Sequence, residues 1–381
     1  MTASVPAASV QAPAAFATRL SFFAAGFVMA AWASLIPFAK AQVGANDAQL
    51  GVLLLCLGIG SIVAMPVTGY VSARRGARGM VLLGGFGLVA LLPVLLLAPS
   101  ALTLGIALFL FGGALGTIDV SMNVHASEVE RLADRPLMSG FHAMWSVGGI
   151  AGAGGMAGLL TLGLPPLAAA FAAASLAALA MTLATPRLLR ARADEVPTFA
   201  PPRGIVLLLA GLTAAVFLIE GAILDWGALL SVERGLLETA RAGLGFMLFS
   251  VAMAAGRLLG DRIVALIGPF ATLFGGGIVV AFGIALMLLS AAAAPALAGF
   301  FLVGLGAANL VPVLFSAAGR QKVMAPGLAI AAVTSTGYAG ILLGPALIGF
   351  ASQVTSLSAA FWGLAALVLV FPATARVVAR T

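Results

Sequence analysis

Charged residues are scarce in this sequence. Asp, Glu, Lys and Arg make up 8% of its 381 residues, whereas 62% are hydrophobic and the mean hydropathy is +1.17. A soluble domain carries about 25% charged residues, so this composition excludes one and indicates an integral membrane protein in a lipid bilayer. The net charge of +7 does not indicate nucleic-acid binding, because the basic residues form short clusters between apolar runs, as membrane topology requires.

Cysteine and histidine are almost absent. The single cysteine, Cys56, lies in an apolar run, so it cannot form an internal disulfide and has no metal-ligand spacing. The sequence also lacks a phosphate-binding loop and a nucleophile beside a base. We therefore expect no metal, no cofactor and no enzymatic activity, and any work at the membrane must draw on an ion or solute gradient. The first fifteen residues lack the basic region of a secretory signal, and we expect them to form a disordered tail.

Long apolar runs dominate the rest of the chain. A helix needs about 20 apolar residues to cross the hydrocarbon of a bilayer, and this length predicts twelve spans. Each must be α-helical, because lipid offers backbone groups no hydrogen-bond partners. The expected spans are Phe16–Phe38, Gln49–Ser72, Met80–Leu97, Ala101–Glu128, Leu137–Leu162, Leu164–Thr185, Gly204–Ser231, Arg241–Gly260, Pro269–Ser290, Ala294–Gly319, Ala325–Phe350 and Ser356–Val378.

The distribution of basic residues predicts the orientation. Twelve spans place both termini on one side, and all but three of the 19 Lys and Arg residues fall on that side. The three exceptions are Lys40, Arg234 and Arg241, whereas Arg257 is counted with the majority. The side rich in positive charge is cytoplasmic, so we expect both termini inside and a multi-pass protein of the bacterial inner membrane.

A polar stretch divides the chain. PRLLRARADEVPTFAPPRG, Pro186 to Gly204, has the proline and charge content of a cytoplasmic linker. We expect a tail at 1–15, an N-terminal six-helix bundle at 16–186, the linker at 187–203 and a C-terminal six-helix bundle at 204–381. LFGGALGTID and LVGLGAANLV lie about 190 residues apart in the two halves, as duplicated transporter halves would.

These features, with a basic turn after the second span, resemble the major facilitator superfamily over nearly the whole chain. The superfamily's pattern there is Gly, three residues, Asp-Arg, one residue, Gly and basic residues. Its matches are Gly69, Arg74, Gly76 and Arg78, with Ala73 in place of the acid. The resemblance implies an all-α fold of two pseudo-symmetric six-helix bundles. It also implies a cytoplasmic latch that depends more on the second half. The gating residues so implied are Arg74, Arg75, Arg78, Asp261 and Arg262.

A finer resemblance lies in DVSMNVHASEVE, RPLMSGFHAMWSVGG and EGAILDWGALL. These segments are similar to the YbjJ/MosC-type branch, related to sugar–proton symporters of the fucose-permease kind. The resemblance implies transport of a sugar- or polyol-like solute. In the fifth span, SVGGIAGAGGMAG lacks the proline of the drug-antiporter signature, which disfavours an antiporter.

Asp119 and Asn123 lie four residues apart and therefore share a helix face. Asp119 is roughly ten residues from the inner end of its span, hence about 15 Å deep. An ionised carboxylate at that depth is costly unless it is paired or faces water. We expect Asp119 to be the main proton carrier and Asn123 a solute contact, against the alternative of a structural hydrogen bond to a neighbouring helix.

His125 and His142 lie near the inner ends of successive spans, and the short connection between them predicts neighbouring helices. His142 shares a face with Trp145, and together they could offer a solute a hydrogen bond and an aromatic platform. His125 could relay protons. The alternative is that both histidines are solvated at the interface.

The seventh span carries two acids. Glu220 is about 24 Å along the helix, and Asp225 lies a further 7–8 Å outward. We expect Glu220 to act in proton coupling, whereas Asp225 is either a solute contact or an acid wetted at the outer rim. Beside it, Trp226 is expected to anchor at the interface. Trp32, at the equivalent place in the first span, is either a cavity wall or packing.

Asn309 in the tenth span completes the candidate solute contacts. The leading hypothesis is a monomeric, proton-coupled secondary transporter that moves a small polar solute by alternating access. Sodium is an alternative coupling ion, because carboxylates bind either. The alternative functions are a proton-driven efflux pump for amphipathic compounds and a non-transporting membrane sensor.

Overall fold

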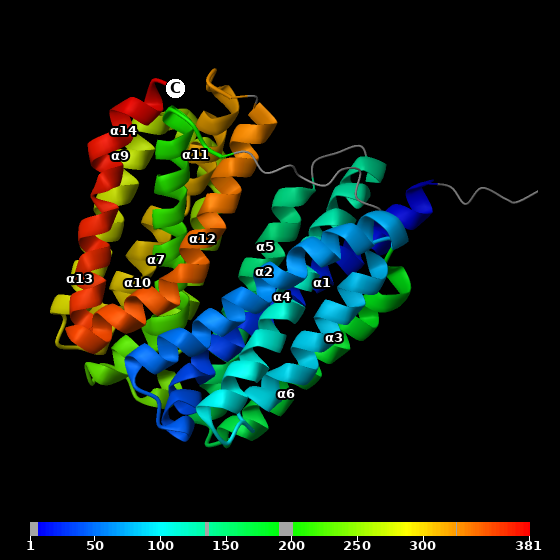
Figure 1. The fold of residues 1–381 in the computed structure, drawn as a ribbon, viewed down its shortest axis with the longest axis vertical. Helices are drawn as coiled ribbons and strands as arrows, with labels where there is room; N and C mark the ends of the chain where they lie inside the picture. Colours follow the sequence, from blue (N-terminus) through cyan, green and yellow to red (C-terminus); the bar gives the residue numbers. More distant parts are fainter. Residues whose placement is uncertain (1–6, 134–136, 190–200, 325) are drawn as a thin grey trace, which may run out of the picture. The chain divides into compact units, whose positions relative to one another are not determined.

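The structure is a computed structural model that describes residues 7–133, 137–189, 201–324 and 326–381. No strand occurs in this part of the chain, and Figure 1 shows an all-helical protein. Its α-helices are α1 (Ala7–Val43), α2 (Asp47–Arg75), α3 (Arg78–Leu95), α4 (Ala101–Ala133), α5 (Met138–Thr161), α6 (Pro166–Ala184), α7 (Ile205–Glu233), α8 (Leu244–Leu258), α9 (Gly260–Leu289), α10 (Ala293–Ala307), α11 (Leu310–Arg320), α12 (Pro326–Val354), α13 (Leu357–Val368) and α14 (Val370–Ala379).

Among the described residues, twelve helical segments are long and apolar enough to cross a membrane, which confirms the expected number of spans. Two of them are interrupted helices, since α10 with α11 and α13 with α14 each make one span. The tail needs a correction, because α1 begins at Ala7, inside the segment expected to be disordered. Residues 7–15 are rich in alanine, which favours helix. Residues 1–6 lie outside the described part.

The turn between the eighth and ninth spans also lies elsewhere than expected. Helical hydrogen bonds continue past the expected end at Gly260, with Leu259 N donating to Ala255 O (3.1 Å) and Ile263 N to Leu259 O (2.9 Å). The backbone leaves the helical conformation at Gly268, whose φ is 80°. Glycine adopts this angle without strain and Pro269 then begins the next helix. Residues 261–267, expected to form part of a cytoplasmic loop, are therefore helical.

Two compact units make up the chain. The first comprises Met1–Gly44 with Cys56–Val196, and the second Ala45–Leu55 with Pro197–Thr381. The start of α2 thus belongs to the second unit, where the Ser352 hydroxyl of α12 donates to Asp47 Oδ2. The expected linker at 187–203 lies mostly outside the described residues, since 190–200 are not described.

Glycines bring the helices of each unit into close contact. A Cβ on Gly148 or Gly152 of α5 would lie 2.3 or 2.2 Å from the carbonyl oxygens of Phe23 or Phe27 in α1. In the second unit, a Cβ on Gly340 of α12 would lie 2.2 Å from the carbonyl oxygen of Ala214 in α7. Small residues permit such approach in lipid, where packing rather than water drives association. These two contacts hold α1 and α7, which carry candidate residues, in their units.

Candidate functional site

An acid and a base from neighbouring helices meet inside the second unit. Arg257 Nη2 of α8 lies 3.5 Å from Glu220 Oε1 of α7. The Glu220 side chain is 19% exposed and that of Arg257 42%. The sequence predicts Glu220 as a buried acid and places Arg257 at the inner end of its span; the helix instead continues to Gly268, so Arg257 lies near the middle of a continuous helix. The Gly268–Pro269 dipeptide is the signal that could have placed the turn.

Both groups lie near the middle of a continuous helix. At 1.5 Å per residue, Arg257 is about 20 Å from the start of α8 and about 16 Å from Gly268. Glu220 is about 22 Å from the start of α7 and about 20 Å from its end. A guanidinium cannot lose its proton, and at this depth it is tolerated where it is paired or reaches water. The pair therefore joins α7 and α8 near the middle of both helices, with Glu220 the more buried partner.

Asn309 packs against the turn of helix that carries Arg257. Its Nδ2 donates to the carbonyl oxygen of Gly256 at 3.1 Å, and a Cβ on Gly260 would lie 2.1 Å from its Oδ1. The residue is buried at the interruption between α10 and α11. Its amide nitrogen is engaged in helix packing, so Asn309 supports the position of Arg257 as well as being a proposed solute contact.

Asp225 is buried in α7, with 8% of the residue exposed. The residues that the structure describes offer its carboxyl group no hydrogen bond and no ion pair. The alternative of an acid wetted at the outer rim is therefore wrong. An unpaired charge so buried is costly, which makes Asp225 a second candidate for exchanging a proton on this helix.

Two buried tryptophans leave an indole N–H without a partner. Trp32 of α1 and Trp226 of α7 are 1% and 0% exposed, and within the described part of the chain neither Nε1 makes a hydrogen bond. Trp226 is therefore not an anchor at the membrane interface, because such an anchor reaches the headgroups. A buried donor without an acceptor costs about 1–3 kcal/mol, so the two N–H groups are candidates to donate to a bound solute.

In the first unit, Asp119 and Asn123 lie half-buried on α4. The Nδ2 atom of Asn123 donates to the backbone oxygen of Asp119 at 2.9 Å, which leaves the Asn123 carbonyl oxygen as an acceptor. Thr117 of the same helix is buried and receives a hydrogen bond from Thr68 of α2 at 3.3 Å. This stretch of α4 is thus a polar band within a span.

The two histidines have different surroundings. His125 is buried and faces Thr18 Oγ1 at 2.9 Å and the backbone N–H of Leu189 at 2.8 Å. The reading of a solvated His125 is therefore wrong. His142 is exposed on α5 and packs edge-on against Phe22 with ring centroids 5.0 Å apart, while Trp145 on the same helix is half-buried.

The proposed gating residues lie at helix ends or near them. Arg74 is exposed with its guanidinium 4.5 Å from the ring centroid of Tyr70, Arg75 is exposed, and Arg78 is half-buried at the start of α3. Arg262 is exposed on α9. The side chain of Asp261 lies outside the described part, so its expected role in a cytoplasmic latch stays a prediction.

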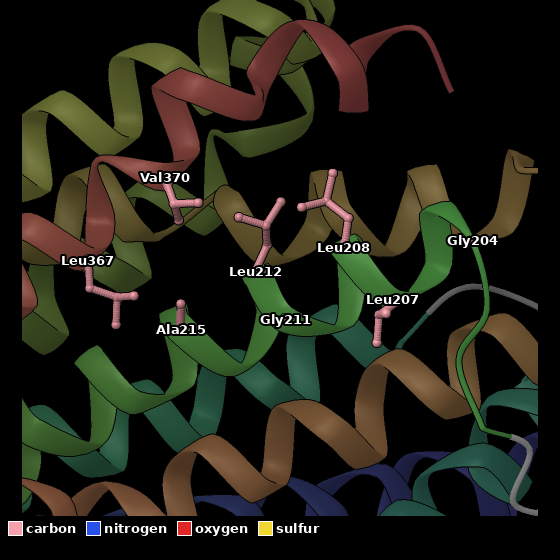
Figure 2. Close-up of a pocket in the computed structure, with 8 residues that line it drawn as sticks. All are labelled: Gly204, Leu207, Leu208, Gly211, Leu212, Ala215, Leu367 and Val370. Carbon is pink, nitrogen blue, oxygen red and sulfur yellow. The ribbon is translucent and has the colours of Figure 1, made fainter.

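An apolar groove of about 440 Å³ lies along the first half of α7, away from the charged pair. Figure 2 shows Leu212 and Ala215 of α7 opposite Leu367 and Val370, which flank the break between α13 and α14. Its lining has no polar side chain. A polar solute would leave its hydrogen bonds unmade there, so this groove is not a candidate solute site.

The twelve long apolar helices among the described residues define a polytopic membrane protein. A family model described as Major Facilitator Superfamily matches residues 20–326. The chain belongs to this superfamily, which confirms the resemblance found in the sequence.

Relatives and solved structures agree with this assignment. An uncharacterised MFS-type transporter of Yersinia pestis is 50% identical over 366 residues, covering 95% of each chain. The membrane protein MosC of Rhizobium meliloti is 32% identical over 357 residues, covering 90% of this chain and 85% of MosC. Among solved structures, the nucleoside transporter NupG has a TM-score of 0.75 at 13% identity, covering 97% of this chain and 98% of NupG. A human organic anion transporter (TETRAN) has a TM-score of 0.63 at 17% identity, covering 98% and 100%; these two likenesses show the fold.

Proposed function

We propose that the protein is a proton-coupled transporter that moves a small polar solute across the bacterial inner membrane by alternating access. The observation that carries the proposal is the ion pair between Glu220 of α7 and Arg257 of α8 in the second unit. Such a pair can open when its acid is protonated, which links proton uptake to a change of contacts within the span.

Polar groups in both units support the proposal. Asp119 with Asn123 in the first unit and Asp225 in the second supply further ionisable or hydrogen-bonding groups. The unpartnered indole N–H groups of Trp32 and Trp226 supply donors of the kind that a hydroxyl-rich solute accepts. We assign Asp119 and Glu220 to proton coupling, and the solute contacts to Asn123, His142, Trp145, Asn309, Trp32 and Asp225.

The test uses the purified full-length protein. A thermal-shift screen of sugars, polyols, inositols and sugar acids identifies a stabilising compound. Proteoliposomes with a trapped pH dye then report whether a gradient of that compound drives proton movement. We expect proton movement with the unmodified protein, and its loss in Asp119→Asn and Glu220→Gln.

The matched control is Glu238→Gln, which neutralises an exposed acid next to the 3-10 turn Thr239–Arg241. This variant should transport and move protons like the unmodified protein. Solute flux without proton movement, at any imposed pH gradient, would contradict proton coupling. If the same flux depends on a sodium gradient, the coupling ion is sodium rather than the proton.

A further inference from the structure

We propose that the transported solute carries a carboxylate, and that Arg257 binds this group when Glu220 takes up a proton. The inference rests on the proton-coupled transport proposed above and narrows its substrate class. It follows from the geometry of the pair, from the charges around it and from the balance of charge during a transport cycle.

Arg257 contacts Glu220 through a single long hydrogen bond. One guanidinium nitrogen, Nη2, contacts one carboxylate oxygen at 3.5 Å, the outer limit of a hydrogen bond. Guanidinium–carboxylate pairs that hold a structure together are often bidentate, with two parallel bonds. The Arg257 side chain is also 42% exposed although it lies near the middle of a continuous helix. It therefore has N–H donors to offer a second, planar anion.

Among the described side chains, Glu220 is the acid that contacts Arg257. Helices α8, α11, α12, α13 and α14 pack against α7. Their sequences contain no Asp or Glu, and their charged residues are Arg257, Arg320 and Arg376. On α7 itself, Asp225 lies five residues beyond Glu220 and is buried on another face. Helices α9 and α10 pack against α8, and their charged residues are Asp261 and Arg262 of α9. Asp261 follows Arg257 by four residues, and its side chain lies outside the described part. Of the acids whose side chains are described, Glu220 is the one whose protonation releases Arg257.

The charge balance favours an anion over a neutral solute. When Glu220 is ionised, the pair is neutral overall. When Glu220 is protonated, Arg257 retains a full positive charge without a partner inside a span, which is costly. A solute carboxylate restores neutrality, whereas a polyol cannot. One proton and one anion would therefore enter together, and the site would be neutral before and after.

The test compares acids with uncharged compounds of the same carbon skeleton. The probes are gluconate with glucitol, galactonate with galactitol, and glucuronate with glucose, each added to the detergent-purified protein at low and high pH. The readout is thermal stabilisation as a function of concentration. We expect at least one acid to stabilise the protein while its neutral counterpart does not. Its affinity should fall as the pH rises, because ionised Glu220 then competes for Arg257.

Three variants make the test specific. Arg257→Gln should lower the binding affinity for the stabilising acid by roughly 30-fold or more. Glu220→Gln mimics the protonated acid, so it should bind the same compound with an affinity that no longer depends on pH. Arg320→Gln, which removes an exposed arginine from the end of α11, is the matched control and should behave like the unmodified protein. Should Arg257→Gln fail to fold, the double variant Glu220→Gln/Arg257→Gln, which has no unpaired charge, takes its place.

The outcomes separate this inference from the proposed function. Equal stabilisation by an acid and its neutral counterpart, retained binding in Arg257→Gln, or no stabilisation by any acid would overturn the anion site. Proton movement driven by a neutral compound in proteoliposomes would support proton-coupled transport and contradict the anion site. Binding of an acid that never moves protons would instead contradict proton coupling and leave the anion site standing.

Discussion

Glu220 and His125 show two ways in which a span accommodates a polar side chain. Glu220 is compensated by a charge on the neighbouring helix through one long contact. His125 is compensated by two short hydrogen bonds. Because Thr18 donates its own proton to Ala14 O and Leu189 donates to Nε2, the imidazole must be neutral with its proton on Nδ1. The first arrangement can open, whereas the second ties α4 to α1 and to Leu189.

We predict that His125→Phe, which keeps a planar ring, lowers the free energy of unfolding by about 1–3 kcal/mol because the Leu189 N–H loses its acceptor. The unfolding transition in detergent measures this change. His142→Phe is the control, since His142 is exposed, and it should have a much smaller effect. Equal effects of the two substitutions would contradict a structural role for His125.

The unpartnered indoles allow a second prediction at this scale. Trp32→Phe or Trp226→Phe removes a buried N–H that makes no hydrogen bond in the structure. We expect unchanged or slightly greater stability without solute and a weaker affinity for the stabilising compound, by roughly 5- to 30-fold. Titration by thermal shift measures both quantities. Trp362→Phe, at an exposed ring, is the control. If affinity is unaffected, the indoles do not contact the solute.

At the scale of helices, packing depends on a few glycines. Glycines spaced along one helix do not all contact a neighbouring helix. Gly152 of α5 faces the backbone of α1, whereas a Cβ on Gly155 would meet nothing within 4 Å. Sequence spacing assigns both to a row of small residues. Only the position of the neighbouring helix distinguishes them.

Gly152→Ala should destabilise the protein by about 1–3 kcal/mol, because the added methyl group forces α1 and α5 apart. Gly155→Ala should be neutral or stabilise by up to about 1 kcal/mol, since it removes backbone freedom at no steric cost. The midpoint of thermal unfolding in the same detergent compares the two. A stable Gly152→Ala protein would argue against the close contact.

The turn at Gly268 gives a further prediction for an element. Alanine at this position, where φ is 80°, would be strained by about 1–2 kcal/mol. Gly275→Ala, on the same helix without positive φ and with open space around it, is the matched control. Loss of stability in Gly268→Ala alone, measured by thermal unfolding, supports a turn at this residue. No difference between the variants would argue for a helix that ends near Gly260.

At the scale of the whole molecule, orientation follows from charge. The excess of Lys and Arg on one side predicts that both termini are cytoplasmic. The correction at Arg257 removes one residue from that excess and leaves its direction unchanged.

Cysteine labelling tests this orientation, because the chain has a single native cysteine to remove. In a Cys56→Ser background, we expect Glu233→Cys to react with a membrane-impermeant maleimide added to intact cells. Arg320→Cys should react only after the cells are opened. The reverse pattern would show that the termini face outward.

Composition and span length predict much of the architecture. They predict only part of the candidate site. Glu220 was predicted as a buried acid because hydropathy shows it inside a span. Its partner was not, because a helix end was assigned at Gly260 rather than at the Gly268–Pro269 turn. His125 was misread for a related reason: its partners, Thr18 and Leu189, are 107 and 64 residues away.

The sequence by itself determined the helical architecture and the twelve candidate membrane spans that the described residues form, because lipid forces backbone groups to pair within each segment. The tertiary structure alone decided which polar side chains meet. Glu220 and Arg257 are 37 residues apart, and only the packing of α8 on α7 brings their charges together.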